Sequence, residues 1–379
     1  MARPDLRHLR FPVEQSSGRY YPELPHPYRN DFQRDRDRIV HARAFRRLED
    51  KTQVFTPGLS DHFRNRLTHT IEVSQIARTV AGVLRLDEDL TEALALGHDV
   101  GHPPFAHAGE EELDRMMSRF HDRFDHNLHS LRILETFEQR YARFPGLNLT
   151  FEVREGIAKH SRDFKQGEIP ELDGYLPGLR PPLEAQLIDL ADEIAYNTAD
   201  LDDGFSAGLF TMDDIIRQVP QYSEIAGAID TQFAGAPDKI RFQEGLRALI
   251  NWLVSGLIEG TYSAAGDAGL SDVDAVREHP QRIARMRSDV QETNAALKRF
   301  LHAHVYHSPA LAAERSRLTG MISQLFEFFL ERPDQMPEGY AASAEPLHRA
   351  VCDYIAGMTD GYFRRTYAQL LGSTPPTRE

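Results

Sequence analysis

The chain has 379 residues and a formal net charge of −14, and its composition, 41% hydrophobic and 27% charged, is typical of a soluble globular protein of one large or two ordinary domains. The acidic balance argues against a general nucleic-acid coat, and the single cysteine, Cys352, excludes an intrachain disulfide and a thiolate zinc site. The sequence has no apolar run of membrane-spanning length and no apolar signal-peptide core near its start, so we expect a cytoplasmic protein with no membrane partner.

The order of predicted elements indicates an all-α fold. Residues 1–30 contain five prolines and no sustained period, which predicts an irregular arm. Residues 56–63 and 165–182 have the composition of loops, and residues 373–379 are expected to fray. Apolar residues at helical spacing predict helices over 31–48, 67–84, 90–99, 108–120, 126–144, 150–161, 183–204, 239–259, 281–304, 308–331 and 344–371.

The stretch LALGHDVGHPPFAHAGE, residues 94–110, gathers titratable side chains at the end of an apolar helix. His98 and Asp99 are adjacent there, and an imidazole beside a carboxylate suits a divalent ion such as Mn, Mg, Fe or Zn. Capping of the helix end is the alternative interpretation of this pair. The helix itself is expected to stop at Gly101 and the two prolines that follow.

The helix predicted over 183–204 carries a polar stripe beside its apolar face. Its members are spaced three, four and four residues apart and therefore share one side: Asp189, Asp192, Tyr196 and Asp200. Carboxylates beside an apolar face are costly to bury unless a cation meets them. A metal ion would meet that need, and so would Arg66 or Arg46 in a purely structural arrangement.

His69, near the start of the helix over 67–84, fits a surface or core histidine when it is considered alone. With His98, Asp99 and Asp192 it forms the order H…HD…D on three helices. On these residues the sequence resembles the HD-domain phosphohydrolases, and more narrowly the deoxyguanosine triphosphate triphosphohydrolase-like branch. The segments that carry the resemblance run from residue 34 to residue 204: RDRDRIVHARAFRRLEDKTQVF, RNRLTHTIEVSQIAR, GHDVGHPPFAHAGE, FDHNLHSLRIL, EVREGIAKHS and ADEIAYNTADLDDG.

The resemblance implies hydrolysis of a deoxynucleoside triphosphate between the α-phosphorus and the 5′-oxygen, which gives a deoxynucleoside and tripolyphosphate. It also implies one divalent metal per subunit, with Mn or Mg first and Co, Fe or Zn as alternatives. Matched by motif, the metal ligands are His69, His98, Asp99 and Asp192; the catalytic residues are His107, Glu110 and His126; and the substrate contacts are Arg66, Gln53, Tyr196, Asp200 and Arg46.

The chemistry of the catalytic residues agrees with these roles. A deoxyribose 5′-alkoxide is a poor leaving group and needs a proton from a positioned acid, for which a histidine is suited. Glu110 follows His107 by three residues, so on a helix that begins near Ala106 its carboxylate can orient the ring. A loop histidine that caps the next helix is the alternative for His107. The other nearby histidines have plainer expected roles: His102 in a turn, His160 in the core, and His129 not as a ligand.

The chain departs from the family pattern at one position. The family motif NTHDLDDG predicts a histidine where this chain has Ala199. That position lies seven residues, or two helical turns, after Asp192, so it is expected to flank the pocket. The change therefore bears on substrate contact or selectivity rather than on metal binding.

The resemblance predicts an HD-domain helical bundle with additional C-terminal helices: one unit over 1–379, with a metal-binding core over 31–205 and a C-terminal part, 206–379, packed on it. It also suggests a homo-oligomer, often a hexamer, an activating nucleotide, and single-stranded DNA as a partner. The arginines of residues 34–47 would serve a second nucleotide; their pairing with Asp31, Asp35 and Asp37 is the structural alternative. The competing functions are hydrolysis of another phosphoester and a regulatory protein that binds nucleotides or single-stranded DNA.

Overall fold

The computed structural model describes residues 4–53, 64–307, 309–341 and 345–372. Within these ranges the regular structure is helical, and the only extended pairings are two isolated bridges, Arg19 with Thr150 and Thr52 with Asn65. The prediction of an all-α fold is confirmed. None of the described helices combines the length and the apolar character that crossing a membrane requires.

The chain forms two compact units, each built from three separate segments. Unit 1 comprises residues 1–37, 69–96 and 149–308, and unit 2 comprises residues 38–68, 97–148 and 309–379. Each unit therefore contains segments from both sides of residue 205. The division into a core over 31–205 and a C-terminal part over 206–379 stays a prediction.

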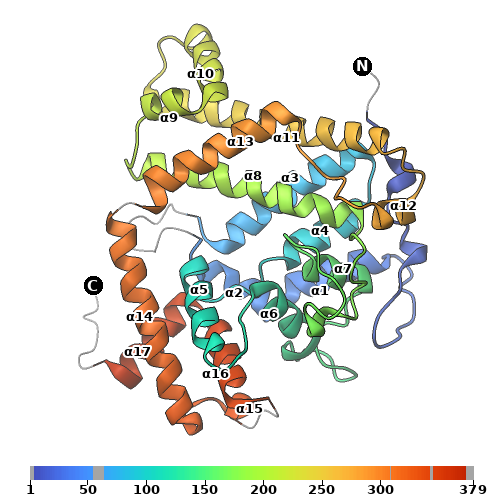
Figure 1. Ribbon diagram of the computed structural model, residues 1–379, viewed down its shortest axis with the longest axis vertical. Coiled ribbons are helices and arrows are strands. Elements are labelled where there is room, and N and C mark those ends of the chain that lie inside the picture. Colours follow the sequence, from blue (N-terminus) through green and yellow to red (C-terminus); the bar gives the residue numbers. More distant parts are fainter. Residues whose placement is uncertain (1–3, 54–63, 308, 342–344, 373–379) are drawn as a thin grey trace. The chain divides into compact units, whose positions relative to one another are not determined.

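Unit 1 is organised around the long helix α8 (Leu183–Ser206), which packs against α7 (Phe151–Ala158), α11 (Asp238–Asp267) and α13 (Ser288–Leu301) (Figure 1). Leu187, Ile194 and Leu201 of α8 are fully buried because they recur at the helical period. The unit also holds most of α1 (Asp31–His41), α3 (Arg66–Leu84) and α4 (Glu88–Gly97), together with α9 (Met212–Gln218), α10 (Pro220–Gln232) and α12 (Val273–Glu278).

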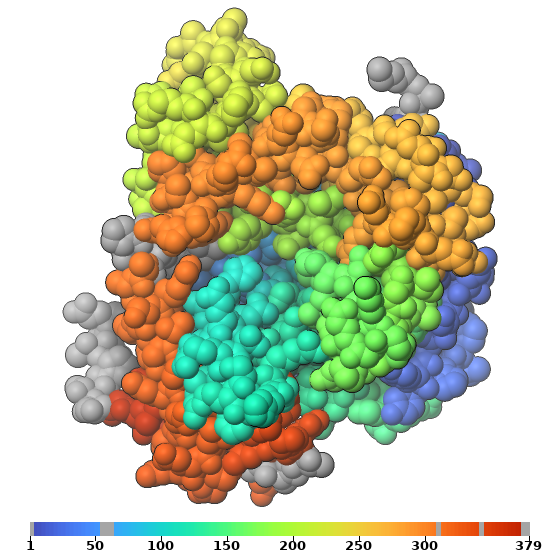
Figure 2. Space-filling view, viewed as in Figure 1, coloured from blue at the N-terminus to red at the C-terminus, as the bar shows by residue number. Residues whose placement is uncertain are grey.

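Unit 2 has its core where α5 (Ala106–Ser118) packs against α14 (Pro309–Glu331) and α16 (Leu347–Ala356). Figure 2 shows α5, in cyan, beside the orange α14 on the visible surface. Met117, Phe326 and Phe329 are fully buried between these helices. The remaining helices of this unit are α2 (Arg43–Arg47), α6 (His126–Arg132), α15 (Glu338–Ala341) and α17 (Asp360–Leu371).

The helix predicted over 344–371 is divided at residues 357–359 into α16 and α17, and two other predicted helices are interrupted by contacts with distant parts of the chain. The helix predicted over 31–48 breaks at Ala42, which has extended backbone angles, and resumes as α2. In the segment predicted as a helix over 126–144, the α-helix ends at Arg132 and a π-helix follows over Ile133–Phe137. The helical structure stops at Glu138, which has extended backbone angles. The Glu138 carboxylate accepts a hydrogen bond from the backbone N–H of Ala44 at 2.7 Å, so a contact across 94 residues fixes this end.

Other boundaries also differ from the predicted ones. The helix predicted over 281–304 begins only at Ser288. The preceding segment is not helical and is bound to α8, since the backbone N–H of Ile283 donates to the side chain of Gln186 at 2.7 Å. The helix predicted over 150–161 begins at Phe151; Thr150 directly precedes it, but its hydroxyl donates to the carboxylate of Asp35 at 2.6 Å and does not cap the helix. The predicted loop over 56–63 and the predicted frayed tail over 373–379 lie outside the described residues.

Candidate active site

In unit 1, α3 and α8 bring together two predicted metal ligands. His69 lies in the first turn of α3, and Asp192 lies in the middle of α8. The Nε2 atom of His69 is 2.7 Å from Oδ1 of Asp192, across 123 residues of sequence. The histidine side chain is 1% exposed and the aspartate side chain is 29% exposed, so the pair has one buried member and one that solvent reaches.

A second histidine approaches the same carboxylate. His160, just after α7, is buried, and its Nε2 atom lies 3.9 Å from Oδ2 of Asp192. Its Nδ1 atom is 2.7 Å from Oδ1 of Asp189, one turn earlier on α8, and that carboxylate also receives Arg282. Our sequence interpretation of His160 as a plain core histidine missed this carboxylate contact, because only the fold brings it to α8.

Further along α8, Asp200 is fully buried and accepts a hydrogen bond from the hydroxyl of Tyr306. The ring of Tyr196 lies 6.0 Å from the ring of Tyr306, measured between centroids. Burial, together with the charge of Asp200, raises the pKa of Tyr306 far above its ordinary value, so this phenol stays protonated and acts as a donor. No motif pointed to Tyr306; it follows α13 in a π-helix over His302–Tyr306, a geometry frequent at functional sites.

In unit 2, three further predicted site residues, His98, Asp99 and Arg66, are almost fully buried. The Nη1 atom of Arg66 donates to Oδ2 of Asp99 at 2.6 Å, and Oδ1 of Asp99 lies 2.8 Å from Nδ1 of His102 and 3.5 Å from Nε2 of His98. Burial alone would raise the pKa of Asp99, but the charge of Arg66 and the neighbouring imidazoles outweigh it and hold that pKa well below its usual range. Asp99 is therefore a permanent carboxylate, as a metal ligand has to be.

The predicted catalytic residues form one cluster in unit 2. The carboxylate of Glu110 lies 2.7 Å from Nδ1 of His126 and 3.8 Å from Nδ1 of His107. The ring of His102 stacks on His126 with centroids 3.9 Å apart and meets His107 edge-on at 6.0 Å. Burial opposes ionisation of Glu110, but hydrogen bonds from His107 and His126 hold its pKa well below the ordinary range. The side chain of His107 is 60% exposed, and a proton donor needs such access to a substrate.

Close packing of the backbone explains this cluster. Gly101 has no room for a Cβ atom, because an added one would lie 2.2 Å from the carbonyl oxygen of His126. Its N–H donates to the hydroxyl of Ser130 at 2.9 Å, and its carbonyl oxygen lies 2.8 Å from Nδ1 of His129. Because Gly101 has no side chain, the loop that carries it packs closely against α6, and this places His102 beside His126. We had expected Gly101 to end the preceding helix, but α4 already ends at Gly97.

The remaining predicted contacts are less well defined. Gln53 is buried, and its Oε1 atom has no hydrogen-bond partner among the described residues, whereas Arg46 is exposed at the end of α2. Ala199 is buried in α8. In the arginine-rich segment, Arg34 pairs with Asp31 at 3.1 Å and Arg36 with Asp37 at 3.2 Å, which favours the structural interpretation of those two arginines.

Comparison with known proteins now adds to this geometry. The HD domain family model matches residues 66–197, and the phosphohydrolase-associated domain model matches residues 284–369. Deoxyguanosinetriphosphate triphosphohydrolase-like proteins match almost end to end. The one from Geobacter sulfurreducens is 43% identical over 92% of this chain and 90% of its own length, that from Azoarcus sp. is 44% identical (94% and 93%), and that from Paracoccus denitrificans is 41% identical (95% and 98%).

The chain belongs to the deoxyguanosinetriphosphate triphosphohydrolase-like family. The resemblance stated from the motifs is confirmed, and the chain is a hydrolase of the HD type. The phosphohydrolase-associated match covers α13 of unit 1 and, in unit 2, α14, α15, α16 and most of α17.

The donor set fits the divalent metal that this HD-type hydrolase would hold. Neutral imidazoles and carboxylates suit borderline and hard divalent ions, and thiolates are absent because the one cysteine is buried in unit 2 among apolar side chains. Each unit supplies a histidine and an aspartate from the family motif: His69 with Asp192, and His98 with Asp99. In unit 2 the ligand atoms of His102, His107 and Glu110 also lie within 4.8 Å of one another.

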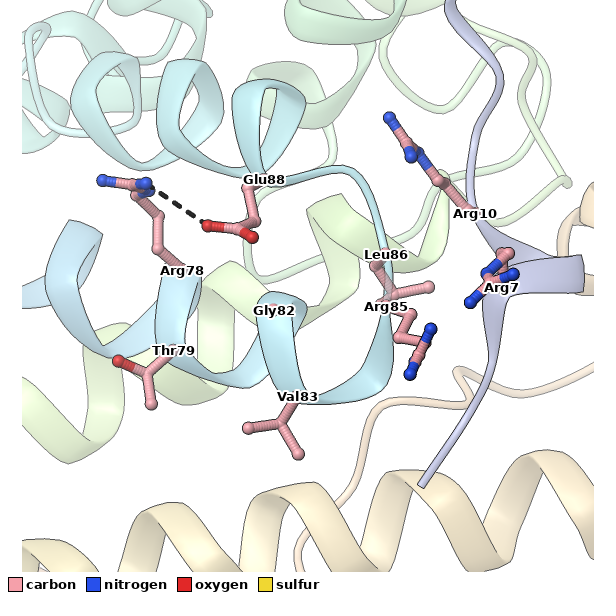
Figure 3. Close-up of a pocket in the computed structure, with 9 residues that line it drawn as sticks. All are labelled: Arg7, Arg10, Arg78, Thr79, Gly82, Val83, Arg85, Leu86 and Glu88. Carbon is pink, nitrogen blue, oxygen red and sulfur yellow. Dashed lines mark hydrogen bonds and ion pairs between the residues drawn. The ribbon is translucent and has the colours of Figure 1, made fainter. Parts of the chain in front are cut away.

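An arginine-lined cavity of the HD-type hydrolase is not part of this site. The cavity, about 780 Å³ in unit 1, lies beside the C-terminal half of α3 (Figure 3). Arg78 lies nine residues after His69 on α3, a rise of about 13 Å. The cavity's arginines already have carboxylate partners: Arg78 with Glu88 at 3.3 Å, Arg10 with Asp87 at 2.5 Å, and Arg7 and Arg85 with Asp5 at 3.9 and 3.5 Å. Its positive charge is therefore largely balanced.

Proposed function

We propose that this chain hydrolyses deoxynucleoside triphosphates to a deoxynucleoside and tripolyphosphate, with water attacking the α-phosphorus. The observation that carries the proposal is the pairing of predicted ligands inside each unit: His69 with Asp192 at 2.7 Å in unit 1, and His98 beside Asp99 in unit 2. Relatives that match the chain almost end to end are named deoxyguanosinetriphosphate triphosphohydrolase-like proteins, which supports the substrate class.

We propose that His69, His98, Asp99 and Asp192 hold one divalent ion, Mn or Mg in the first place. When bound, such an ion supplies Lewis-acid polarisation of a phosphoryl oxygen and a more acidic water. Four protein ligands leave positions open for water and phosphate. Asp99 is well prepared for this role, because Arg66 and His102 fix both of its oxygens and keep it ionised.

We assign the proton transfer to the histidine–glutamate cluster of unit 2. His107, the most exposed member, donates a proton to the 5′-oxygen as the bond to the α-phosphorus breaks. Glu110 stays ionised and stabilises the protonated rings. His126 holds Glu110 in place, because its ring and its backbone N–H both contact the Oε1 atom of Glu110. The exposed Arg46 would meet the outer phosphates.

We place the deoxyribose beside α8, where Tyr196, Asp200 and Tyr306 form a hydrogen-bonding group. A buried carboxylate that accepts from a phenol can also accept from a sugar hydroxyl. Gln53 is a further candidate for this contact. Ala199 leaves room where the family pattern has an imidazole, so the preferred base is left open.

The test is a substrate panel. Metal-stripped protein is incubated with each deoxynucleoside triphosphate, singly and in pairs, with Mn, Mg or Co, and the products are separated by chromatography. The proposal predicts tripolyphosphate and deoxynucleoside in equal amounts, and faster turnover in some pairs would identify an activating nucleotide. Orthophosphate as the product would indicate a different phosphoester substrate. If no nucleotide turns over, and Asp99→Ala leaves single-stranded DNA affinity and its salt dependence unchanged, a binding protein is the better description.

The assembly is tested separately. The family resemblance leads us to propose a homo-oligomer with closed symmetry, for which a hexamer is the first expectation. Light scattering at several concentrations measures the mass directly, and a mass equal to one chain of 43.1 kDa would contradict this proposal.

A further inference from the structure

The turn that leads into α5 has an unusual backbone. Phe105 has φ 65° and ψ 30°, and Ala106 has φ 55°, so two successive residues with side chains adopt left-handed angles. Left-handed angles are unfavourable for residues with a Cβ atom, and they persist only where the surroundings enforce them. His107 and Glu110 follow directly, so this turn sets the direction in which both side chains leave the backbone.

A carboxylate from the C-terminal helices fixes this turn. Asp360, the first residue of α17, accepts a hydrogen bond from the backbone N–H of Phe105 at 3.1 Å through Oδ1. Its other oxygen, Oδ2, accepts the backbone N–H of Thr52 at 3.0 Å and also the hydroxyl of Thr52. Asp360 is 5% exposed and lies 255 residues from Phe105 in the sequence. A buried carboxylate with three donors is a fixed point of the structure.

Two further residues of α17 hold the side chain of Phe105. The ring of Phe363 meets the ring of Phe105 edge-on, with centroids 5.0 Å apart. The guanidinium of Arg364 lies over the same ring at 5.1 Å. One helix therefore holds both the backbone and the side chain of the left-handed residue.

The start of the same loop, at His102, is also held by contacts with other parts of unit 2. Lys51 is buried, and its ammonium group donates to the carbonyl oxygen of His102 and, at 3.2 Å, to that of Ala356 at the end of α16. The carbonyl oxygen of Lys51 accepts the backbone N–H of Arg66 at 3.1 Å. The loop from His102 to Phe105 is thus anchored at both ends to the C-terminal helices of unit 2.

We propose that Asp360 is a positioning residue for His107 and Glu110, acting through the Phe105–Ala106 turn. This inference rests on the catalytic role proposed above for the cluster. The inference gives a specific role to α17, which lies in the segment matched by the phosphohydrolase-associated model. This helix holds the proton-transfer residues in the geometry that catalysis requires. None of the residues of α17 needs to touch the substrate. Small displacements of such residues reduce turnover strongly without weakening substrate binding.

The main test is Asp360→Asn. The amide offers only one acceptor oxygen, which satisfies the two donors of Thr52, so the Phe105 N–H then faces an NH₂ group. We expect hydrogen exchange at peptides containing Phe105 to become at least about tenfold faster. We also expect kcat to fall by about 10- to 100-fold with KM changed less than about threefold, and metal content to stay at the wild-type level.

Tyr362→Ala is the matched control. Tyr362 lies in the same turn of α17, is half-exposed, and hydrogen-bonds to Tyr354 at 3.1 Å. This variant loses a large side chain of α17 but none of the contacts to Phe105, so exchange at Phe105 and kcat should stay within about twofold of wild type. If Asp360→Asn does not fold, Phe363→Leu removes the ring contact and retains the carboxylate; it should accelerate exchange and lower kcat to a smaller degree.

Wild-type kcat in Asp360→Asn, or equal losses in Asp360→Asn and Tyr362→Ala, would overturn the inference. Failure of the proposed function is separable from this result. If the wild-type protein hydrolyses no deoxynucleoside triphosphate, the positioning role of Asp360 is tested by the ring NMR signals of His107 and His126, which can be recorded without substrate. Their displacement in Asp360→Asn but not in Tyr362→Ala supports the positioning role, and identical signals in all three proteins contradict it.

Discussion

His126 and Glu110 form the tighter of the two histidine–glutamate contacts in the cluster: their side chains are 2.7 Å apart, and the backbone N–H of His126 donates to the same glutamate oxygen at 3.0 Å. His107 is more distant from that carboxylate, at 3.8 Å. The carboxylate therefore serves two imidazoles of different exposure, one that holds it and one that solvent and substrate can reach. This difference supports the roles proposed above, in which His126 fixes Glu110 and His107 donates the proton.

His107→Ala is expected to lose most of the turnover rate and keep the metal. The ring has no part in the proposed ligand set, and a general acid contributes about 10² to 10⁴ in rate. Steady-state kinetics and metal analysis of the same preparation check this. His98→Ala provides the comparison, since it should lose metal and rate together. A His107→Ala enzyme with wild-type turnover would remove this residue from the donor role.

Glu110→Gln should shift the pH dependence of kcat. Hydrogen bonds from the two histidines keep the pKa of Glu110 well below its usual range, so the wild-type group is ionised at every working pH. The amide removes a full negative charge beside the protonated imidazole, which then loses its proton more readily. The alkaline limb of the profile should move to lower pH, with kcat reduced about 10-fold or more. An unshifted limb would contradict the role given to Glu110.

Arg66→Ala should be strongly destabilising in the metal-free protein. Arg66 and Asp99 are both almost fully buried, and removal of the guanidinium leaves Asp99 without its main counter-charge. Breaking such a buried pair costs about 3 to 5 kcal/mol. Urea denaturation measures the loss, and added Mn should recover part of it because the ion supplies positive charge to the same carboxylate. Equal stability of the variant and wild-type proteins would show that the pair has no such role.

Glu184→Gln tests the electrostatics of unit 1 away from the catalytic residues. Glu184 is fully buried at the start of α8, where it accepts the backbone N–H groups of Phe11 and Asp87, and burial raises its pKa to about 7. A raised pKa means that the folded protein favours the protonated form. This contribution to stability is complete below about pH 4.5 and is lost as the pH rises through 7.

Glutamine cannot lose that proton, so the stability of Glu184→Gln relative to wild type should increase by about 3 kcal/mol between pH 4.5 and 7.5. Urea unfolding at four pH values across this range gives the difference directly. A difference that does not change with pH would show that the carboxylate is ionised in the folded protein throughout.

Local sequence patterns were sufficient for much of the fold. The apolar periods of α3 and α8 predicted both helices to within about two residues, and the H…HD…D order pointed to the family and to the four proposed ligands. These features are set by residues close together in the sequence, or by a motif that the family shares.

The features that the sequence did not predict all depend on distant contacts. The contact of Glu138 with Ala44 sets the end of the π-helix that follows α6, and the contact of Gln186 with Ile283 precedes the start of α13. The contact between Tyr306 and Asp200 spans 106 residues, and Asp360 reaches Phe105 across 255. No local period or spacing contains such information, because it arises only when the helices pack.

Metal stoichiometry tests most directly the proposal that His69, His98, Asp99 and Asp192 hold a single divalent ion. Manganese bound per chain is measured for wild type, for His98→Ala from unit 2 and for Asp192→Ala from unit 1, under the same dialysis conditions. The account predicts one equivalent in the wild-type protein and almost none in either variant. Retention of one equivalent by either variant would contradict it.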